Sequence, residues 1–301
     1  MTNTVAVLTG PHPRERIFTQ DTWREFTESF DVIELSDDSA LDDVLPTAFA
    51  IVGQPDLPRA RLDRAPQLRA VLNVEGNFYP NVDYAACFAR GIHVLGCGPA
   101  YADAVAEFAL GLALDLARGI SREDRAFRQG RERYVASGSG DAILLRGCDV
   151  GLIGFGNLGR ALLPLLEPFR CTVRAFDPWL PDTVLARAGA LPVALAELLT
   201  QSRIVFVLAT VTAESELLLG AAELDLLPAG ARFVLVSRAP VVDFDALLDR
   251  VAAGRLTAAI DVWPAEPVPA AHRARTLDGL VLSPHRAGGI PQAFAEIGRM
   301  V

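Results

Sequence analysis

The chain has 301 residues, of which 51% are hydrophobic and 22% charged, a typical globular composition with enough length for two domains. Its formal net charge of −9 argues against nucleic acid or an anionic membrane surface as the main partner. All 28 basic residues are arginines, so a Schiff-base lysine and a phosphate-loop lysine are excluded.

The four cysteines, Cys87, Cys97, Cys148 and Cys171, have neither metal-ligand spacing nor the density of a secreted disulfide scaffold. They are expected to be thiols in a reducing compartment. The first residues lack the pattern of a signal peptide, and no run of about 18 uncharged apolar residues is present. These features predict a soluble cytoplasmic protein without a metal site or a membrane span.

Short apolar runs alternate with helical patterns over residues 1–98, which predicts a parallel sheet covered by helices. The expected strands are Val5–Leu8, Val32–Leu35, Phe49–Val52, Leu68–Val74 and Ile92–Leu95, and the expected helices are Arg14–Ser29, a short one including Leu62–Pro66, and Val82–Arg90. Tyr101–Leu116 is apolar nearly all round and predicts a long buried helix leading into a second domain. Ser121–Arg133 is charged and predicts a surface helix.

The stretch Val150–Asp177 has the order of a dinucleotide-binding unit: strand, GxGxxG turn, helix, strand and acid. Gly154 permits the turn, Gly156 leaves the backbone open to a pyrophosphate, and Gly159 lets the helix and strand pack closely. Asp177 is placed to accept hydrogen bonds from the ribose hydroxyls. No arginine follows it directly, which favours NAD over NADP.

Beyond this unit the pattern continues with alternating helices and strands. The expected helices are Val193–Leu199, Ala221–Leu227 and Phe244–Ala252, the expected strands are Ile204–Leu208, Arg232–Val236, Thr257–Val262 and Leu280–Leu282, and Pro264–Arg275 is expected to be a long loop.

Three candidate catalytic side chains follow three of these strands. His285 could carry a proton, Glu266 could fix its tautomer and raise its pKa, and Arg238 could hold a carboxylate with its planar fork. A single histidine, arginine or glutamate is more often structural or solvated. Here all three follow strands, and because the carboxyl ends of parallel strands lie at one edge of a sheet, the three side chains are expected to converge there. The other histidines are His12 in a proline-flanked loop after the first strand, His93 inside a strand and His272 in a polar loop, and for a single histidine a structural role is usually favoured.

The chain resembles the D-isomer-specific 2-hydroxyacid dehydrogenase family over nearly its full length. The matching stretches are NVEGNFYPNVD (73–83), YADAVAE (101–107), VGLIGFGNLG (150–159), VSRAPVVDFDALL (236–248), AAIDVWPAEP (258–267) and LSPHRAGG (282–289). The resemblance implies an α/β fold of two similar doubly wound parallel-sheet domains with a cleft between them. These are a flavodoxin-like substrate-binding domain, 1–98 completed by 287–301, and a Rossmann NAD-binding domain, 99–286.

The resemblance also implies roles for individual residues. His285 would be the acid/base, Glu266 its partner, and Arg238 would bind the carboxylate and carbonyl of the substrate. The implied cofactor-binding residues are Gly154, Gly156, Asn157, Leu158, Gly159, Asp177, Thr210 and Asp261, the last beside the nicotinamide carboxamide. The implied substrate-binding residues are Glu75, Gly76, Asn77 and Arg238, with Arg286 as a candidate for a second anionic group and otherwise a surface arginine.

The expected function is NAD(H)-dependent interconversion of a 2-oxo acid and its D-2-hydroxy acid by a homodimer whose arm includes the helix starting near Tyr101. Departures from the family pattern are Ala239-Pro240 after Arg238, Tyr101 in place of asparagine, and bulky residues in the 73–83 loop. Two alternatives remain open: an NAD-sensing, non-catalytic corepressor-like protein, and a phosphite-type dehydrogenase. Formate oxidation is disfavoured because formate enzymes carry glutamine at the position of Glu266.

Overall fold

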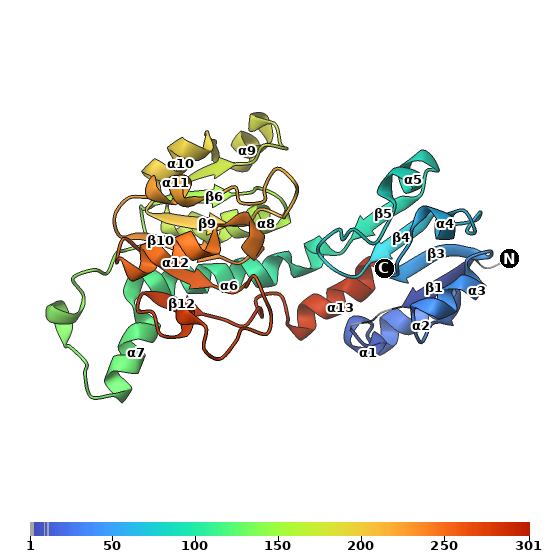
Figure 1. Cartoon of the computed structure of the whole chain (residues 1–301), viewed down its shortest axis with the longest axis horizontal. Helices are drawn as coiled ribbons and strands as arrows, with labels where there is room; N and C mark the ends of the chain where they lie inside the picture. Colours follow the sequence, from blue (N-terminus) through green and yellow to red (C-terminus); the bar gives the residue numbers. More distant parts are fainter. Residues whose placement is uncertain (1–2, 9, 11) are drawn as a thin grey trace. The chain divides into compact units, whose positions relative to one another are not determined.

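The computed structural model describes residues 3–8, 10 and 12–301 and divides the chain into two compact units. Unit 1 comprises Met1–Tyr101 and Gly289–Val301, and unit 2 comprises Ala102–Gly288. Helix α6 (Gly98–Arg118) begins in unit 1 and continues into unit 2. Each unit is built on its own parallel sheet (Figure 1).

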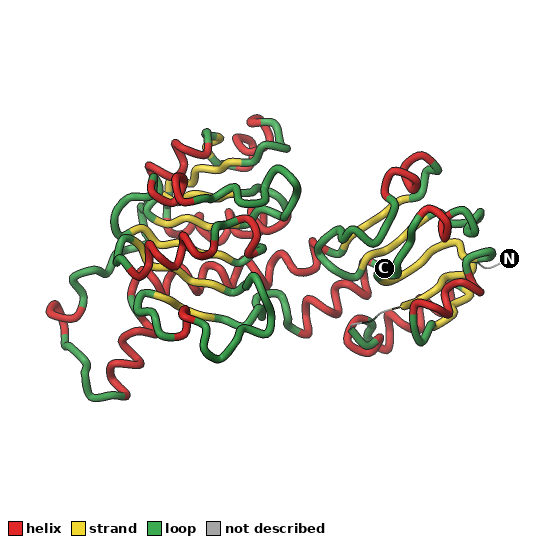
Figure 2. The backbone as a smooth tube through the Cα atoms, viewed as in Figure 1, coloured by secondary structure: helices red, strands yellow, loops and turns green. Residues whose placement is uncertain are grey.

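Unit 1 contains a five-stranded parallel sheet with the order β2-β1-β3-β4-β5, the flavodoxin-like arrangement (Figure 2). Its strands are β1 (Thr4–Leu8), β2 (Asp31–Glu34), β3 (Ala48–Gly53), β4 (Ala70–Asn73) and β5 (His93–Gly96). Its helices are α1 (Arg14–Ile17), α2 (Gln20–Ser29), α3 (Leu41–Val44), α4 (Arg59–Leu62), α5 (Tyr84–Ala89) and α13 (Pro291–Met300).

The strands of unit 1 contribute alternate side chains to two hydrophobic cores, one on each face of the sheet. Ala6 and Ile51 pack with residues of α3, α4 and α5. Val5 and Val52 pack with residues of α1, α2 and α13. Burial on both faces explains why these strands read as continuous apolar runs in the sequence.

Unit 2 contains a seven-stranded parallel sheet with the order β12-β11-β10-β9-β6-β7-β8, a Rossmann order with one added strand. Its strands are β6 (Asp149–Ile153), β7 (Thr172–Phe176), β8 (Leu191–Pro192), β9 (Ile204–Val207), β10 (Ala231–Leu235), β11 (Leu256–Ile260) and β12 (Leu280–Leu282). Its helices, besides most of α6, are α7 (Ile120–Arg128), α8 (Asn157–Leu166), α9 (Asp182–Ala188), α10 (Leu195–Gln201), α11 (Ala221–Asp225) and α12 (Phe244–Ala252).

Helices α10, α11 and α12 cover one face of this sheet and enclose a hydrophobic core with it, while α6 and α8 lie on the other face (Figure 1). Strands β9 and β10 are buried along their whole length. Together with unit 1, this arrangement confirms the predicted fold class of two doubly wound parallel-sheet domains. No helix among the described residues is long and apolar enough to cross a membrane.

Some predicted helices differ from those observed. The single helix expected over Arg14–Ser29 is wrong, because the chain is extended at Phe18 and the Thr19 side chain caps a second helix by accepting from Thr22 N. The expected short helix lies earlier, at Arg59–Leu62, and ends before Pro66. Helix α9 was missed in the sequence.

Candidate functional site

The glycine turn after β6 is shaped by contacts that exclude side chains at two of its three glycines. A Cβ on Gly154, whose φ is +92°, would lie 2.7 Å from the backbone of Ala209. A Cβ on Gly159 would lie 2.8 Å from the Gly154 carbonyl oxygen. At Gly156, by contrast, a Cβ would meet nothing within 4 Å. The second glycine therefore leaves open space at the N-terminus of α8.

The first turn of α8 supplies hydrogen-bond donors at this open space. Asn157, Leu158 and Gly159 occupy its first three positions, where no intrahelical carbonyl can accept from their N–H groups. Gly156 and Asn157 are exposed. Unpaired amides together with the positive end of the helix dipole suit a pyrophosphate, so the residues present fit a dinucleotide.

Asp177 connects the end of β7 to the glycine turn. Its Oδ2 accepts from Phe155 N (2.8 Å), and its Oδ1 accepts from Trp179 N (2.9 Å) and Leu180 N (3.2 Å). This carboxylate therefore also organises the two loops around it, a role that spacing alone did not reveal.

A cavity of about 480 Å³ lies beside Asp177 in unit 2. Two further acids, Asp182 and Glu197, line it, and none of the described residues that line it is basic. The lining residues are Ala175, Phe176, Asp177, Pro178, Leu180, Asp182, Leu185, Pro192, Val193, Ala194 and Glu197. An acidic wall without an arginine is unfavourable for a 2′-phosphate.

The candidate acid/base pair forms at the carboxyl ends of two neighbouring strands, β11 and β12. His285 Nδ1 lies 2.9 Å from Glu266 Oε2, and the two side chains are 42% and 38% exposed. Glu266 Oε1 accepts from Trp263 N (3.2 Å), which orients the carboxylate. Among the described residues His285 Nε2 has no partner, so this nitrogen is available to a ligand. His285 itself is held in a left-handed conformation with φ +50°.

Asp261, directly after β11, holds the loop that carries His285. It is fully buried, and its carboxylate accepts from Ser283 Oγ, from Arg286 N (3.0 Å) and from Ala287 N (3.1 Å). Its carbonyl oxygen accepts from His285 N (2.7 Å). These four hydrogen bonds hold the chain before His285, at His285 itself and directly after it. The family resemblance implies that Asp261 lies beside the nicotinamide. Nothing in the sequence predicted these hydrogen bonds to the 283–287 loop.

Trp263 links the loop that carries Glu266 to the loop that carries His285. Its backbone N–H donates to Glu266, and its indole Nε1 donates to the carbonyl oxygen of Ser283 (2.9 Å). The ring packs against Phe244 and His272, with ring centroids 5.6 Å and 5.9 Å away. The sequence analysis did not single out Trp263, although a position three residues before Glu266 could have indicated a contact with that carboxylate.

Arg238 follows β10, the neighbour of β11, so the three candidate catalytic residues follow three adjacent strands. Its Nη1 donates to the Ser237 carbonyl oxygen (2.6 Å), and within the described residues it has no acidic partner. Arg286 is exposed and likewise has no ion pair in the described part of the chain. Two unpaired guanidinium groups in the strand-end loops of unit 2 favour an anionic ligand.

Thr210, after β9, is exposed, and its carbonyl oxygen accepts from Ser215 Oγ (2.7 Å).

In unit 1, the loop after β4 is fixed by the buried side chain of Asn73. Its Oδ1 accepts from Glu75 N (2.9 Å) and from Gln54 Nε2 (2.6 Å), and its Nδ2 donates to the Asn77 carbonyl oxygen. The N–H groups of Gly76 and Asn77 have no acceptor among the described residues. Asn73 therefore holds this loop by hydrogen bonds at both ends, and two backbone donors of the loop have no acceptor in the described residues.

The cysteines are free thiols. Burial raises the pKa of Cys97 to about 11 and that of Cys171 to about 11. Thiols of this kind are poor nucleophiles at neutral pH. In the described part of the chain, no group of three or more His, Cys, Asp or Glu side chains could hold a metal ion.

Comparison with known proteins identifies the kind of site. Residues 110–287 match the NAD-binding domain of the D-isomer specific 2-hydroxyacid dehydrogenases. The chain is 31% identical over 248 residues to a glyoxylate reductase of Thermofilum pendens, covering 79% of this chain and 71% of that protein. It is 32% identical over 223 residues to the D-3-phosphoglycerate dehydrogenase of Escherichia coli, covering 72% of this chain and 53% of that protein.

Among solved structures, a phosphoglycerate oxidoreductase from Rhizobium etli is 42% identical, with a TM-score of 0.86 and coverage of 99% of this chain and 92% of that one. The chain spans only about half the length of the Escherichia coli enzyme. These relatives therefore belong to one family, but their names give different substrates, glyoxylate for one and phosphoglycerate for the other two.

Proposed function

The chain belongs to the D-isomer-specific 2-hydroxyacid dehydrogenase family, with an NAD-binding domain in unit 2, and we propose that it interconverts a 2-oxo acid and its D-2-hydroxy acid. The observation that carries this proposal is the His285–Glu266 pair, with Nδ1 bonded to the carboxylate and Nε2 open. A non-catalytic NAD sensor has no need of such a pair. Bound NADH supplies the hydride that reaches the carbonyl carbon.

His285 Nε2 donates the proton to the carbonyl oxygen as the alcohol forms. Glu266, bonded to Nδ1, stabilises the imidazolium that precedes this transfer and the correct ring orientation after it. Asp261 and Trp263 act as positioning residues, because their bonds hold the loops of His285 and Glu266. Each partner restricts where the reactive nitrogen can lie.

Two sets of donors bind the substrate in this proposal. Arg238 binds the carboxylate and polarises the carbonyl, which orients the carbon for hydride transfer. The backbone amides of Gly76 and Asn77, in the loop of unit 1 that the Asn73 side chain holds, are proposed by the family resemblance as further donors for a carboxylate. Arg286 remains a prediction as a contact for a second anionic group.

The preferred cofactor is NAD(H). Asp177 would accept from the ribose hydroxyls of the bound cofactor, and the acidic lining that it shares with Asp182 and Glu197 would repel a 2′-phosphate. Gly156 and the backbone amides of Asn157 and Leu158 are the groups that would hold the pyrophosphate of the bound cofactor. Thr210, at the next strand end, is proposed as a further cofactor contact.

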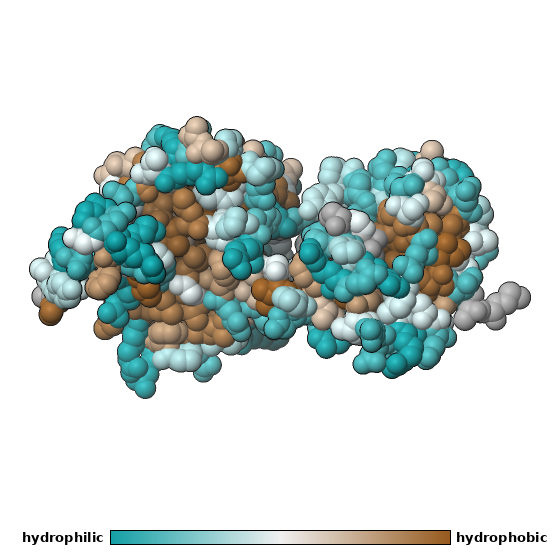
Figure 3. All heavy atoms as spheres, turned by 90° about the horizontal axis from the view of Figure 1, so that it is seen from below, coloured by the Kyte–Doolittle hydropathy of each residue, from teal (hydrophilic) through white to brown (hydrophobic). Residues whose placement is uncertain are grey.

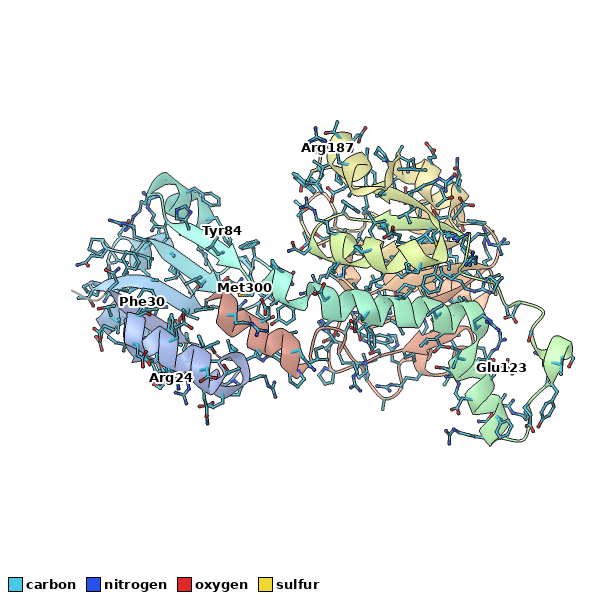
Figure 4. The ribbon with its side chains drawn as sticks, turned by 180° about the vertical axis from the view of Figure 1, so that it is seen from behind. Arg24, Phe30, Tyr84, Glu123, Arg187 and Met300 are labelled. Atoms are coloured by element: carbon cyan, nitrogen blue, oxygen red, sulfur yellow. The ribbon has the colours of Figure 1, made fainter. Side chains whose placement is uncertain are left out.

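A homodimer is the proposed assembly. Helix α7, on which Glu123 is labelled in Figure 4, and the loop after it extend away from the sheet of unit 2. Large apolar side chains are exposed here, at Ile120, Phe127, Tyr134, Val135 and Leu144. Figure 3 also shows apolar side chains gathered on one face of this unit. Sedimentation velocity checks the dimer, and a monomer at micromolar concentration contradicts it.

Cytoplasmic location also stays a proposal, supported by the four free thiols.

The proposal is tested with a panel of 2-oxo acids, each assayed with NADH and with NADPH by loss of absorbance. We expect turnover of at least one 2-oxo acid, formation of the D-2-hydroxy acid, and a kcat/KM that favours NADH. A panel without turnover contradicts the proposal. Oxidation of phosphite with NAD in the same assay favours the phosphite alternative instead.

A further inference from the structure

Two of the four free cysteines lie side by side at the amino ends of neighbouring strands of unit 2. Cys148 directly precedes β6 and Cys171 directly precedes β7, and these strands pair in parallel with Asp149 opposite Thr172. One residue earlier, this register places Cys148 opposite Cys171, on the same face of the sheet, at a strand spacing of about 4.8 Å. A disulfide needs Cα atoms about 4.4–6.8 Å apart. The backbone therefore holds the two cysteines within disulfide reach.

Backbone hydrogen bonds on both sides of the pair fix this arrangement. Thr172 N donates to the carbonyl oxygen of Cys148 (3.0 Å), and Gly147 N donates to the carbonyl oxygen of Phe169 (2.9 Å). The chain that returns from α7 to β6 (Figure 1) thus meets the turn before β7 at these residues. The two cysteines are held by the sheet itself and do not depend on a mobile loop to bring them together.

Both thiols point at the same turn of the chain. The Cys171 thiol donates to the carbonyl oxygen of Leu145 (3.3 Å), which also accepts from Cys148 N (3.0 Å). The Cys148 thiol donates to the carbonyl oxygen of Leu144 (2.7 Å), the residue just before. An S–H group is a weak donor, so little is lost when a side-chain rotation turns one sulfur toward the other.

The two cysteines of unit 1 are placed differently. Cys87 lies in the hydrophobic core on one face of the five-stranded sheet, and Cys97 lies in the core on the other face, so they cannot pair with each other. Both are buried, whereas Cys148 and Cys171 are partly exposed. A dissolved oxidant therefore reaches the pair of unit 2 first.

The surroundings of the pair decide which thiol reacts first. Burial, and after it the neighbouring Cys148 thiol, raise the pKa of Cys171 to about 11. Burial also raises the pKa of Cys148, and Asp149 adds to this rise, but the cations of Arg203 and Arg232 oppose it. Cys148 is therefore the first of the two to form a thiolate, and the reaction is faster in mild alkali than at neutral pH.

We propose that Cys148 and Cys171 form a reversible disulfide when the protein meets a low-molecular-weight disulfide such as oxidised glutathione. The Cys148 thiolate attacks one sulfur of the oxidant and displaces its other half as a thiolate. The Cys171 thiolate then attacks the Cys148 sulfur of this mixed disulfide and displaces the second half. Two protein thiols are oxidised, one disulfide is reduced to two thiols, and these take up the two protons. A dithiol reductant reverses both steps.

The disulfide would clamp the strand–helix–strand unit that carries the glycine turn. It closes a loop over residues 148–171, which includes all of α8, and a cross-link of this kind restricts the unfolded chain. Ligands bind at the carboxyl ends of the strands in open α/β sheets, and the pair lies at the opposite, amino ends. Oxidation is therefore expected to stabilise unit 2 and to leave cofactor binding unchanged. The inference does not depend on which reaction the protein catalyses.

The test incubates the full chain with oxidised glutathione at about pH 8.5, near the ordinary pKa of a thiol, and digests it with trypsin without reduction. Cleavage after arginine places the cysteines in the peptides 147–160 and 171–174. We expect these two peptides to be joined, with the mass of two hydrogen atoms lost. Thiol titration in denaturant should show loss of two of the four thiols, and dithiothreitol should restore both.

Stability measurements test the clamp. In the wild type, oxidation should raise the urea midpoint by about 1 M, and reduction should reverse the change. Cys148→Ser and Cys171→Ser should each abolish the linked peptides and the rise. Cys97→Ala is the matched control and should still form the linked peptides. The Kd for NADH should stay within twofold between the oxidised and reduced wild type.

Four thiols that persist after oxidation overturn the inference. It is equally overturned by glutathione that stays bound to Cys148, by a disulfide that joins two copies of the chain, or by a linked peptide that contains Cys87 or Cys97. An oxidised pair that leaves the urea midpoint unchanged contradicts the clamp.

Discussion

Replacing Asp261 by asparagine tests whether this residue positions His285. The carboxylate accepts three hydrogen bonds in a fully buried setting. Asparagine can keep the bonds from Ser283 and Arg286 as weaker neutral ones, but its NH₂ group would face the N–H of Ala287. Bonds to a charged acceptor contribute about 1.5–3 kcal/mol each and neutral ones about 1 kcal/mol, so we expect a loss of about 3 kcal/mol.

Urea unfolding followed by tryptophan fluorescence measures this loss, and steady-state kinetics measures its effect on turnover. Because Asp261 holds the loop in which His285 adopts a φ of +50°, kcat/KM for the 2-oxo acid should fall about a hundredfold or more. The Kd for NADH should change only a few-fold. Asp278→Asn, at an exposed position just before β12, is the control and should change neither quantity.

A stability change below about 0.5 kcal/mol in Asp261→Asn, together with a large rise in the Kd for NADH, would refute the positioning role. Asp261 would then act mainly on the nicotinamide, as the family resemblance implies. Ser283→Ala provides a second check through a double-mutant cycle, in which the two substitutions should be non-additive.

Three further predictions follow from the described contacts. Arg232→Met should lower the free energy of unfolding by roughly 2–4 kcal/mol, because the buried guanidinium donates to the carbonyls of Leu116, Gly230 and Asp141; urea titration measures it. Asp177→Ala should raise KM for NADH about tenfold or more and raise KM for NADPH less, and equal effects on both cofactors would argue against the ribose contact. Stability should fall between pH 9 and 11, because the buried Cys97 thiol and the half-buried Cys171 thiol keep their protons to a pKa of about 11 while unfolded thiols ionise near 9. Urea midpoints across this range should fall less in Cys97→Ala.

The glycine turn and the strand-end residues could be predicted because their signals are local. Gly154, Gly156 and Gly159 stand at fixed spacing after an apolar run, and each has the surroundings that its role requires. His285 and Glu266 follow neighbouring parallel strands, so topology alone brings them close. Short apolar runs, each followed by a polar residue, are therefore enough to predict that these two side chains lie close together.

Other features depend on contacts that no local pattern encodes. His12 and Glu75 are 63 residues apart in the chain and meet only because β1 and β4 share a sheet edge. Asp261 was assigned to the nicotinamide by resemblance, whereas its bonds to the 283–287 loop depend on how that loop turns. The break between α1 and α2 arises from the cap at Thr19, which competes with a continuous helical pattern.

The central claim is that His285 is the acid/base of a hydride-transfer enzyme. Its most direct test is single-turnover reduction of the best 2-oxo acid with enzyme-bound NADH, compared between the wild type and His285→Asn. We predict that the substitution lowers the transfer rate by about 10²–10⁴ while the Kd for NADH stays within a few-fold. A variant that transfers hydride at the wild-type rate would contradict the claim.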